Sequence, residues 1–470
     1  MVFSSHLFVY YFLPAVVLAY YALPARARHL WLTLASYAFY GWANPAFTWL
    51  MLGSTVVDYV CGRRLGALAP GAPGRRGWVT LSVLSNLSLL GFFKYFNFAV
   101  DSYAAALAAL GLESLRPELT LRVALPLGIS FYTFQSMSYT VDVYRGRTRP
   151  LASFVDFACY VSLFPQLVAG PIIRFSEIAD QLRERSHSFE KIARGIAFFS
   201  LGMAKKVLLA NPCGFVADAA FEAGSLQPLE AWTGVLAYAF QIYFDFSGYS
   251  DMAIGLGLML GFVFPKNFDS PYRAESITDF WRRWHISLST WLRDYLYLPL
   301  GGNRKGPRRT YVNLALVMLL GGLWHGAAWN FVVWGGLHGA WLALERAAGK
   351  HSLYPGLPRA LRVALTFVGV LVTWVFFRAA DLPSAFGYLG SMLGLAAVRP
   401  SAQLLGGLLY QPYFLLSLAV AALVTWTAPQ TWDWSRRITA PRGALALGCL
   451  GLALVAMASQ GYNPFIYFTF

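Results

Sequence analysis

The feature that most constrains the fold of this chain is a series of apolar segments that recurs from one end to the other. Each segment is roughly long enough to cross, or partly cross, a hydrocarbon core of ~30 Å. Lipid leaves backbone groups unsatisfied outside helices and closed barrels, and the alternating pattern of a barrel is absent, so helices are predicted. The segments lie at about 7–23, 30–44, 46–60, 78–99, 121–141, 152–171, 192–212, 231–262, 311–324, 327–344, 361–379, 404–427 and 443–459.

Charged residues are too few for an ordinary soluble protein. They make up 13% of the 470 residues, against about 25% in soluble domains. No polar stretch is long enough to form a soluble domain of its own. We therefore predict a single membrane-embedded domain, residues 1–470, with an all-α polytopic fold of about 11–12 transmembrane helices plus re-entrant and interfacial helices.

The net charge of +15 comes from basic residues in short clusters between the apolar segments. This distribution follows the positive-inside rule, and it favours membrane topology over nucleic-acid binding. Between Lys206 and Lys266 the chain has no Lys or Arg, so the loop in that stretch is expected to face outward. The number of crossings then requires residues 152–171 to re-enter on the cytoplasmic side, and it places the C-terminus outside.

The longest polar region, residues 264–310, carries the pattern of an amphipathic helix. Ser276 and Asp279 resemble a capping box at its start. Aromatic and aliphatic side chains then recur at helical spacing, whereas Arg282 and Arg283 lie off that stripe. We expect this region to lie in the cytoplasmic interface of the membrane.

His325 is the most informative ionisable residue, because such groups are costly inside a membrane. It follows the apolar run 311–324, which reaches only ~21 Å as a helix, so it is expected within the membrane depth. A neutral imidazole there can act as a general base toward a hydroxyl. A structural histidine bonded to a neighbouring helix is the alternative.

Two further histidines lie in apolar surroundings. His285 falls on the aromatic face of the predicted interfacial helix, where packing and function are equally good explanations. His338 is favoured as a structural residue. The sequence has no HExxH motif or histidine-rich cluster, so no metal site is predicted.

The run 241–251 places several polar side chains inside an apolar stretch, among them Asp245, Ser247 and Tyr249. Buried polar groups at membrane depth must line a cavity or bond one another. The run predicts a hydroxyl-rich tunnel, with contacts between helices as the alternative.

At these motifs the sequence resembles the membrane-bound O-acyltransferase family, and within it the branch that acetylates polysaccharides. The resemblance spans nearly the whole chain, and the block 267–339 is its most specific part. The residues that carry it are LPLGISFYTFQSMSY (125–139), FPQLVAGPIIR (164–174), QIYFDFSGYSDMAIG (241–255), NFDSPYRAESITDFWRRWHISLSTWLRDYLYLPLGGNR (267–304), GLWHGAAWNFVVWGGLHG (322–339) and WVFFRA (374–379).

The resemblance implies a helix bundle around a tunnel, with His325 as the catalytic histidine and His285 as the second signature histidine. It also implies acetyl-CoA or another acetyl thioester as a cytoplasmic donor, with no bound cofactor. The acetyl group would pass to an extracytoplasmic polysaccharide such as alginate, through periplasmic acetyltransferase partners. The expected location is the inner membrane of a bacterium, among its lipids. Candidates for donor binding or the tunnel are Arg282, Arg283, Trp324, Asp245, Ser247 and Tyr249.

The C-terminal tail, residues 463–470, is similar to an FxYxxF-like ending found in this family and in a small partner peptide of its D-alanylating relatives. A tyrosine phenol accepts an acyl group once a base removes its proton. We hypothesise that Tyr467 takes the acetyl group transiently; an aromatic membrane-interface residue is the alternative.

Two other functions remain open at this point. The chain could transport or flip a lipid-linked sugar, although it lacks the internal repeats typical of transporters. It could also acylate the hydroxyl of a lipid, a protein or a small molecule, because a fold does not fix the acceptor.

Overall fold

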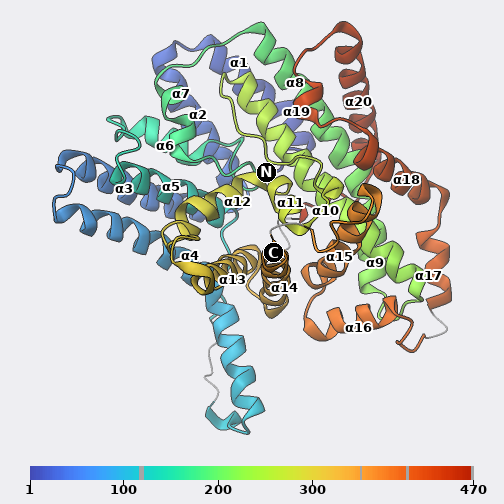
Figure 1. Ribbon diagram of the computed structural model, residues 1–470. Helices are drawn as coiled ribbons and strands as arrows, with labels where there is room; N and C mark the ends of the chain where they lie inside the picture. Colours follow the sequence, from blue (N-terminus) through green and yellow to red (C-terminus); the bar gives the residue numbers. More distant parts are fainter. Residues whose placement is uncertain (116–120, 350–351, 399–401, 467–470) are drawn as a thin grey trace. The chain divides into compact units, whose positions relative to one another are not determined.

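The computed structural model describes residues 1–115, 121–349, 352–398 and 402–466, and these form two compact units, Met1–Ser186 and His187–Phe470 (Figure 1). All regular structure in the described residues is helical, which confirms the predicted all-α class. The prediction of a single domain stays a prediction.

The first unit contains nine helical elements over its described residues, of which α4 is the longest. Its elements are η1 (Phe8–Phe12), α1 (Leu13–Ala22), α2 (Ala25–Gly41), α3 (Ala46–Ala67), α4 (Gly74–Ala109), η2 (Glu113–Leu115), α5 (Ile129–Tyr144), α6 (Phe154–Ser162) and α7 (Phe175–Arg183).

The second unit contains the histidines and the motifs around them. Its elements are α8 (Phe189–Ala204), η3 (Lys205–Ala210), α9 (Asn211–Glu222), α10 (Pro228–Met259), η4 (Pro271–Arg273), α11 (Ile277–Arg283), α12 (Ile286–Leu292), η5 (Arg293–Tyr297), α13 (Gly306–His325), α14 (Trp329–Ala347), α15 (Arg359–Arg378), α16 (Leu382–Met392), α17 (Ala402–Leu409), α18 (Pro412–Thr427), α19 (Thr431–Trp434) and α20 (Ala440–Ser459).

Three described helices are long and apolar enough to cross a membrane by themselves: α4, α15 and α20. The stretch Phe8–Ala22 and helix α18 are shorter apolar helices. Helix α6 ends at Ser162, ahead of Pro165, so the segment 152–171 is not one continuous helix. The number of crossings stays a prediction.

A polar cluster holds α3, α4 and α5 together inside the first unit. The Asp58 carboxylate is fully buried and accepts hydrogen bonds from Asn86 Nδ2 at 2.8 Å and Ser82 Oγ at 2.5 Å. Ser82 Oγ also lies 2.7 Å from Thr140 Oγ1. Each helix therefore contributes a hydrogen-bonding group, as expected where polar side chains bond across apolar helices.

In the second unit, α8 and α10 lie side by side (Figure 1) at two pairs of facing glycines. A Cβ on Gly202 or Gly248 would meet the other glycine's carbonyl oxygen, and the same holds for Gly195 and Gly255. Small residues of this kind let helix backbones approach closely. The glycines of the run 241–255 therefore serve helix packing.

The predicted amphipathic helix of the polar region is interrupted, which corrects the expectation of one continuous helix. Helix α11 ends at Arg283 and α12 begins at Ile286. Between them His285 adopts a left-handed conformation, with φ of 44°. Backbone hydrogen bonds from Asp269 N to Arg283 O and from Ile286 N to Asn267 O, both 2.9 Å, take the groups that a continuous helix would use. Tertiary pairing thus overrides helical periodicity.

Candidate active site

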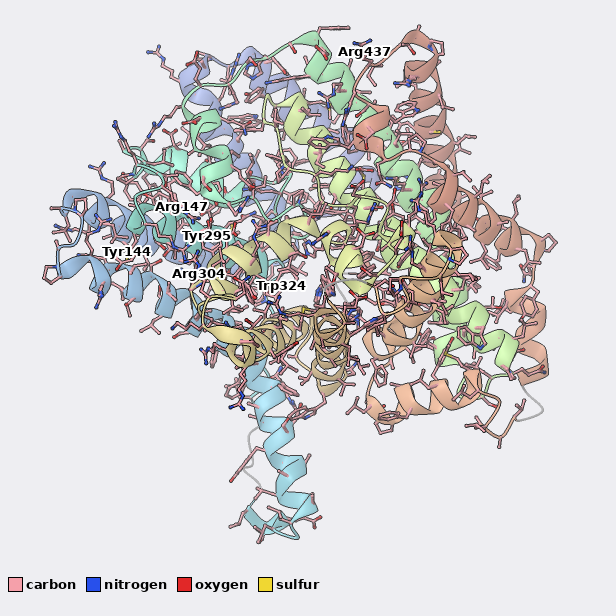
Figure 2. The ribbon with its side chains drawn as sticks, in the orientation of Figure 1. Tyr144, Arg147, Tyr295, Arg304, Trp324 and Arg437 are labelled. Carbon is pink, nitrogen blue, oxygen red and sulfur yellow. The ribbon has the colours of Figure 1, made fainter. Side chains whose placement is uncertain are left out.

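The hairpin of α13 and α14 sets the position of His325, the last residue of α13. The two helices touch at Gly322 and Gly335, because a Cβ on either would collide with backbone of the other helix. This close approach seats the buried His325 ring 5.3 Å from Trp334 on α14, measured between ring centroids. Trp324 (Figure 2) and Phe377 enclose the same ring at 5.0 Å and 5.2 Å.

The structure brings His285 next to His325. Their ring centroids are 6.3 Å apart, and the rings meet edge to face at 64°. His285 is completely buried. It lies at the start of α12, and the indole of Trp324 is 5.9 Å from its ring. The two histidines therefore share one aromatic enclosure.

Asn267 fixes which nitrogen of His285 carries the proton. The backbone N–H of Ser287 donates to the Asn267 side-chain oxygen at 3.2 Å, so that atom must be Oδ1. The same oxygen lies 3.2 Å from Nδ1 of His285, which must therefore donate. The neutral ring then has its lone pair on Nε2, which has no hydrogen-bond partner among the described residues.

Burial lowers the pKa of His285 well below its usual range, and the neighbouring His325 lowers it further. The ring is therefore neutral at physiological pH. A neutral imidazole with a free Nε2 lone pair can accept a hydrogen bond or a proton from a bound molecule.

A mostly apolar cavity of about 280 Å³ opens beside His325. It lies between α12, α13 and α14, and Arg293, Ser289 and Tyr297 supply its polar groups. An apolar cavity with few polar groups and a histidine is the usual form of a small-molecule site. Its other lining residues are Trp281, Leu288, Leu292, Leu314, Val317, Met318, Gly321, Trp334 and Leu342.

His338 is a structural residue, as favoured from the sequence. The indole N–H of Trp281 donates to its Nδ1 at 3.3 Å. Its Nε2 donates to Thr373 Oγ1 at 3.0 Å, and that hydroxyl donates to the Val370 carbonyl. Both ring nitrogens are thus engaged, which leaves no lone pair for chemistry.

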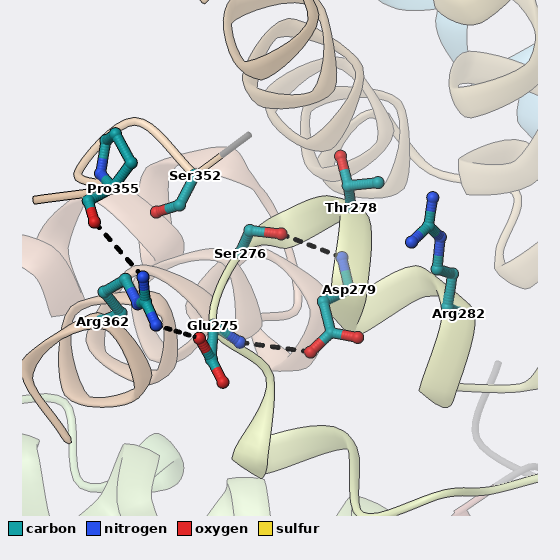
Figure 3. A pocket seen from close by; sticks show the side chains of 8 residues that line it. All are labelled: Glu275, Ser276, Thr278, Asp279, Arg282, Ser352, Pro355 and Arg362. Atoms are coloured by element: carbon teal, nitrogen blue, oxygen red, sulfur yellow. Dashed lines mark hydrogen bonds and ion pairs between the residues drawn. The ribbon is translucent and has the colours of Figure 1, made fainter. Parts of the chain in front are cut away.

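The two adjacent arginines of α11 have different surroundings. Arg283 Nε lies 2.8 Å from Asp279, and its Nη1 donates to the Asp269 carbonyl at 3.3 Å. Arg282 is exposed and has no carboxylate partner in the part of the chain that the structure describes. It lines a polar cavity of about 290 Å³ (Figure 3).

The polar cavity is organised by the beginning of α11. Ser276 Oγ accepts from Asp279 N at 3.0 Å, which confirms the predicted helix cap. Figure 3 shows Arg362 reaching Glu275 on the opposite wall, at 2.6 Å. The buried Glu345 carboxylate accepts from the backbone N–H groups of Ile277 and Thr278 at 2.8 Å and 2.9 Å. Sequence analysis did not single out Glu345.

The polar residues of α10 that the sequence indicated for the tunnel are all buried, but two of them contact the C-terminal tail. Asp245 pairs with Lys206 and accepts from the backbone N–H of Ile466. The Tyr249 ring lies 4.7 Å from that of Phe465. Ser247 Oγ has no hydrogen-bond partner among the described residues. Tyr467 lies outside the described residues.

Comparison with known proteins identifies the group to which these features belong. The model of the membrane-bound O-acyltransferase family matches residues 145–379. A probable alginate O-acetylase AlgI of Azotobacter vinelandii is 43% identical over 503 aligned residues, covering all of both chains. The protein of that name in Pseudomonas aeruginosa is 49% identical over 82% of this chain and 74% of its own length. A peptidoglycan O-acetyltransferase of Helicobacter pylori is 41% identical over 85% of this chain and 81% of its own.

Proposed function

Because this chain belongs to the membrane-bound O-acyltransferase family, we propose that it moves acetyl groups from a cytoplasmic thioester to an extracytoplasmic polysaccharide such as alginate. The chain is a membrane protein and an O-acyltransferase. The acetyl group and the polysaccharide acceptor are supported by the relatives that are named alginate O-acetylase and peptidoglycan O-acetyltransferase. Acetyl-CoA is the proposed donor, and periplasmic acetyltransferases in a bacterial inner membrane are the proposed partners.

The observation that carries the proposal is the pair of buried histidines beside the apolar cavity. His325 lines this cavity of about 280 Å³. The ring centroid of His285 is 6.3 Å from the ring centroid of His325. We assign proton removal from the acceptor hydroxyl to His325. The hydroxyl oxygen attacks the acetyl carbonyl carbon, the C–S bond breaks, and the thiolate recovers the proton from the imidazolium.

His285 has a different role in this scheme. Its Nε2 lone pair accepts a hydrogen bond from an N–H group of the thioester arm, so it orients the donor. Arg282 attracts the donor's phosphates from the polar cavity beside α11. In this scheme four further residues shape the walls of the site and take no part in proton transfer: Arg283, Trp324, Ser247 and Tyr249.

Tyr467 is proposed as the transient acyl acceptor between the donor and the polymer. Its neighbours Phe465 and Ile466 are buried in the second unit. The phenol oxygen would give its proton to a base and attack the acetyl carbonyl, the C–S bond would break, and the thiolate would leave with that proton. An acceptor hydroxyl would then attack the phenyl ester and regenerate the phenol. Tyr467→Phe abolishes acetylation if this is right, and full acetylation by this variant refutes the intermediate.

The test of the main proposal is acetyl release from labelled acetyl-CoA by detergent-purified protein. His325→Ala should remove release, whereas the exposed His6, replaced as His6→Ala, should retain it. Equal release by the wild type and His325→Ala contradicts the assignment of His325. Transfer to a lipid, a protein or a small molecule would appear as label on a different acceptor. Family membership favours this transferase chemistry over transport of a lipid-linked sugar.

A further inference from the structure

The C-terminal tail is bound to the second unit mainly through its backbone. Helix α20 ends at Ser459, and the tail beyond it bonds residues of α9, η3 and α10. The Lys206 ammonium donates to the Pro464 carbonyl. The Asp245 carboxylate accepts from the Ile466 N–H at 2.8 Å. Lys206 and Asp245 thus contact two backbone groups two residues apart.

Lys206 and Asp245 are also paired with each other. The Lys206 Nζ is 2.9 Å from Asp245 Oδ1, and their side chains are only 3% and 2% exposed. Removing two charges from water costs several kcal/mol per ion, and their mutual attraction alone seldom compensates for it. Hydrogen bonds to the tail backbone supply further partners, because they use a second donor of the Lys206 ammonium and the second carboxylate oxygen of Asp245.

Side chains define the path of the tail ahead of this contact. Tyr462 donates to Asp218, which is also paired with Arg378 at 2.6 Å. A Cβ on Gly214 would meet the Tyr462 hydroxyl, so this glycine makes room for it. Asn211 Nδ2 lies 3.3 Å from Asn463 Oδ1.

The aromatic ring of Phe465 completes the fit. It is 6% exposed, and its centroid is 4.7 Å from that of Tyr249 on α10. The tail is therefore enclosed up to Ile466, which is 4% exposed. Ile466 directly precedes the proposed acyl acceptor in the sequence, and its backbone N–H is bonded to Asp245.

We propose that Lys206 and Asp245 are positioning residues that clamp the tail backbone at Pro464 and Ile466 and thereby seat the segment that precedes the proposed acyl acceptor. The need for the tail in transfer rests on the function proposed above. The seating of the tail by this pair does not. Because the clamp binds backbone groups, it tolerates changes of tail side chains more readily than loss of the Ile466 N–H.

The experiment measures hydrogen–deuterium exchange of the tail peptide and acetyl transfer in the same detergent-purified variants. The double variant Lys206→Met with Asp245→Leu removes both charges, so no unpaired buried charge remains to unfold the protein. We expect tail exchange to rise about 10-fold or more, and transfer to fall by a similar factor. Lys205→Met with Asp251→Leu is the matched control, because this neighbouring ion pair, 2.6 Å long, bonds Thr431 and leaves the tail untouched.

A second pair of variants changes the tail itself, at Ile466. Ile466→Pro deletes the N–H that Asp245 accepts, whereas Ile466→Val keeps it. Proline should release the tail and valine should not. Tail exchange that stays at the wild-type rate in both the double variant Lys206→Met with Asp245→Leu and the variant Ile466→Pro overturns the proposal, whatever the activity of these two variants. Released tails with wild-type transfer overturn the positioning role and, with it, the acyl-carrying tail, while leaving the assignment of His325 intact.

Discussion

Asn267 Oδ1 accepts a hydrogen bond from Nδ1–H of His285 at 3.2 Å and so leaves the Nε2 lone pair of that ring available in the active-site enclosure. The oxygen is itself fixed, because Ser287 donates to it through both its backbone N–H and its hydroxyl. Asn267 Nδ2 donates to Ser250 Oγ at 2.9 Å. The tautomer of His285 is thus set by an amide that is bonded through both its oxygen and its nitrogen, in the manner of an orienting residue.

Loss of this hydrogen bond should affect the rate more than donor affinity. In Asn267→Leu the His285 ring is free to hold its proton on Nε2, which removes the acceptor lone pair. We expect kcat to fall about 10- to 100-fold or more, since wrong-tautomer variants of other enzymes lose up to ~10⁴. Steady-state kinetics with labelled acetyl-CoA would test this. Wild-type kcat in Asn267→Leu would contradict the orienting role.

The same position predicts a shift in pH dependence. Burial holds the pKa of His285 well below its usual range, so the ring stays neutral and active as the pH falls. In Asn267→Asp a carboxylate faces Nδ1 and favours the protonated ring, which raises that pKa. The acid limb of the kcat profile should therefore move to higher pH. A profile that coincides with the wild type would show that His285 titration does not limit turnover.

His338 should matter for stability and not for chemistry. Its two nitrogens bond Trp281 and Thr373. His338→Leu leaves the Trp281 N–H without its acceptor, at a cost of about 1–3 kcal/mol, whereas the Thr373 hydroxyl keeps its bond to the Val370 carbonyl. We expect a lower thermal midpoint in detergent, with acetyl release per folded molecule close to that of the wild type. Complete loss of activity in well-folded His338→Leu would assign this residue a role in the reaction.

The sequence predicts the helices, the helix cap at Ser276 and the importance of His325 because each has a local pattern. Apolar length indicates the membrane segments, and the short run 311–324 indicates that His325 lies within the membrane depth. The break at His285 has no such mark, since helical periodicity continues through it and only pairing with residues 267–269 interrupts the helix. The bonding of Asp245 to the tail is equally hidden, because Lys206 and Ile466 are far from it in sequence.

The two arginines of α11 should separate donor binding from stability. Arg282 lines the polar cavity beside α11 without a carboxylate partner among the described residues. Arg282→Gln should therefore raise the KM for acetyl-CoA about 3- to 10-fold, with a weaker salt dependence, and leave the thermal midpoint unchanged. Arg283→Gln loses the bonds to Asp279 and the Asp269 carbonyl, so it should lower the midpoint instead. An unchanged KM in Arg282→Gln would remove this arginine from the donor site.

Neighbouring glycines of α14 provide the sharpest test of how the hairpin positions His325. A Cβ at Gly335 would collide with the Met318 carbonyl on α13, whereas one at Gly336 would meet only Leu319 Cδ2, at 3.7 Å. Gly335→Ala must push the two helices apart and move His325 away from Trp334 and the cavity. A displacement of about 1 Å at a catalytic group can cost ~100-fold in rate.

Gly336→Ala adds the same methyl group to the same helix at a site with ordinary van der Waals contact, and alanine favours the helix over glycine by about 1 kcal/mol. We therefore expect Gly336→Ala to keep wild-type acetyl release and to be at least as stable, while Gly335→Ala loses most of its release. Helix content by circular dichroism would establish that both are folded. If Gly335→Ala retained full activity, His325 would not depend on the contact between Gly322 and Gly335 for its position, and the close approach of α13 and α14 would be a feature of packing alone.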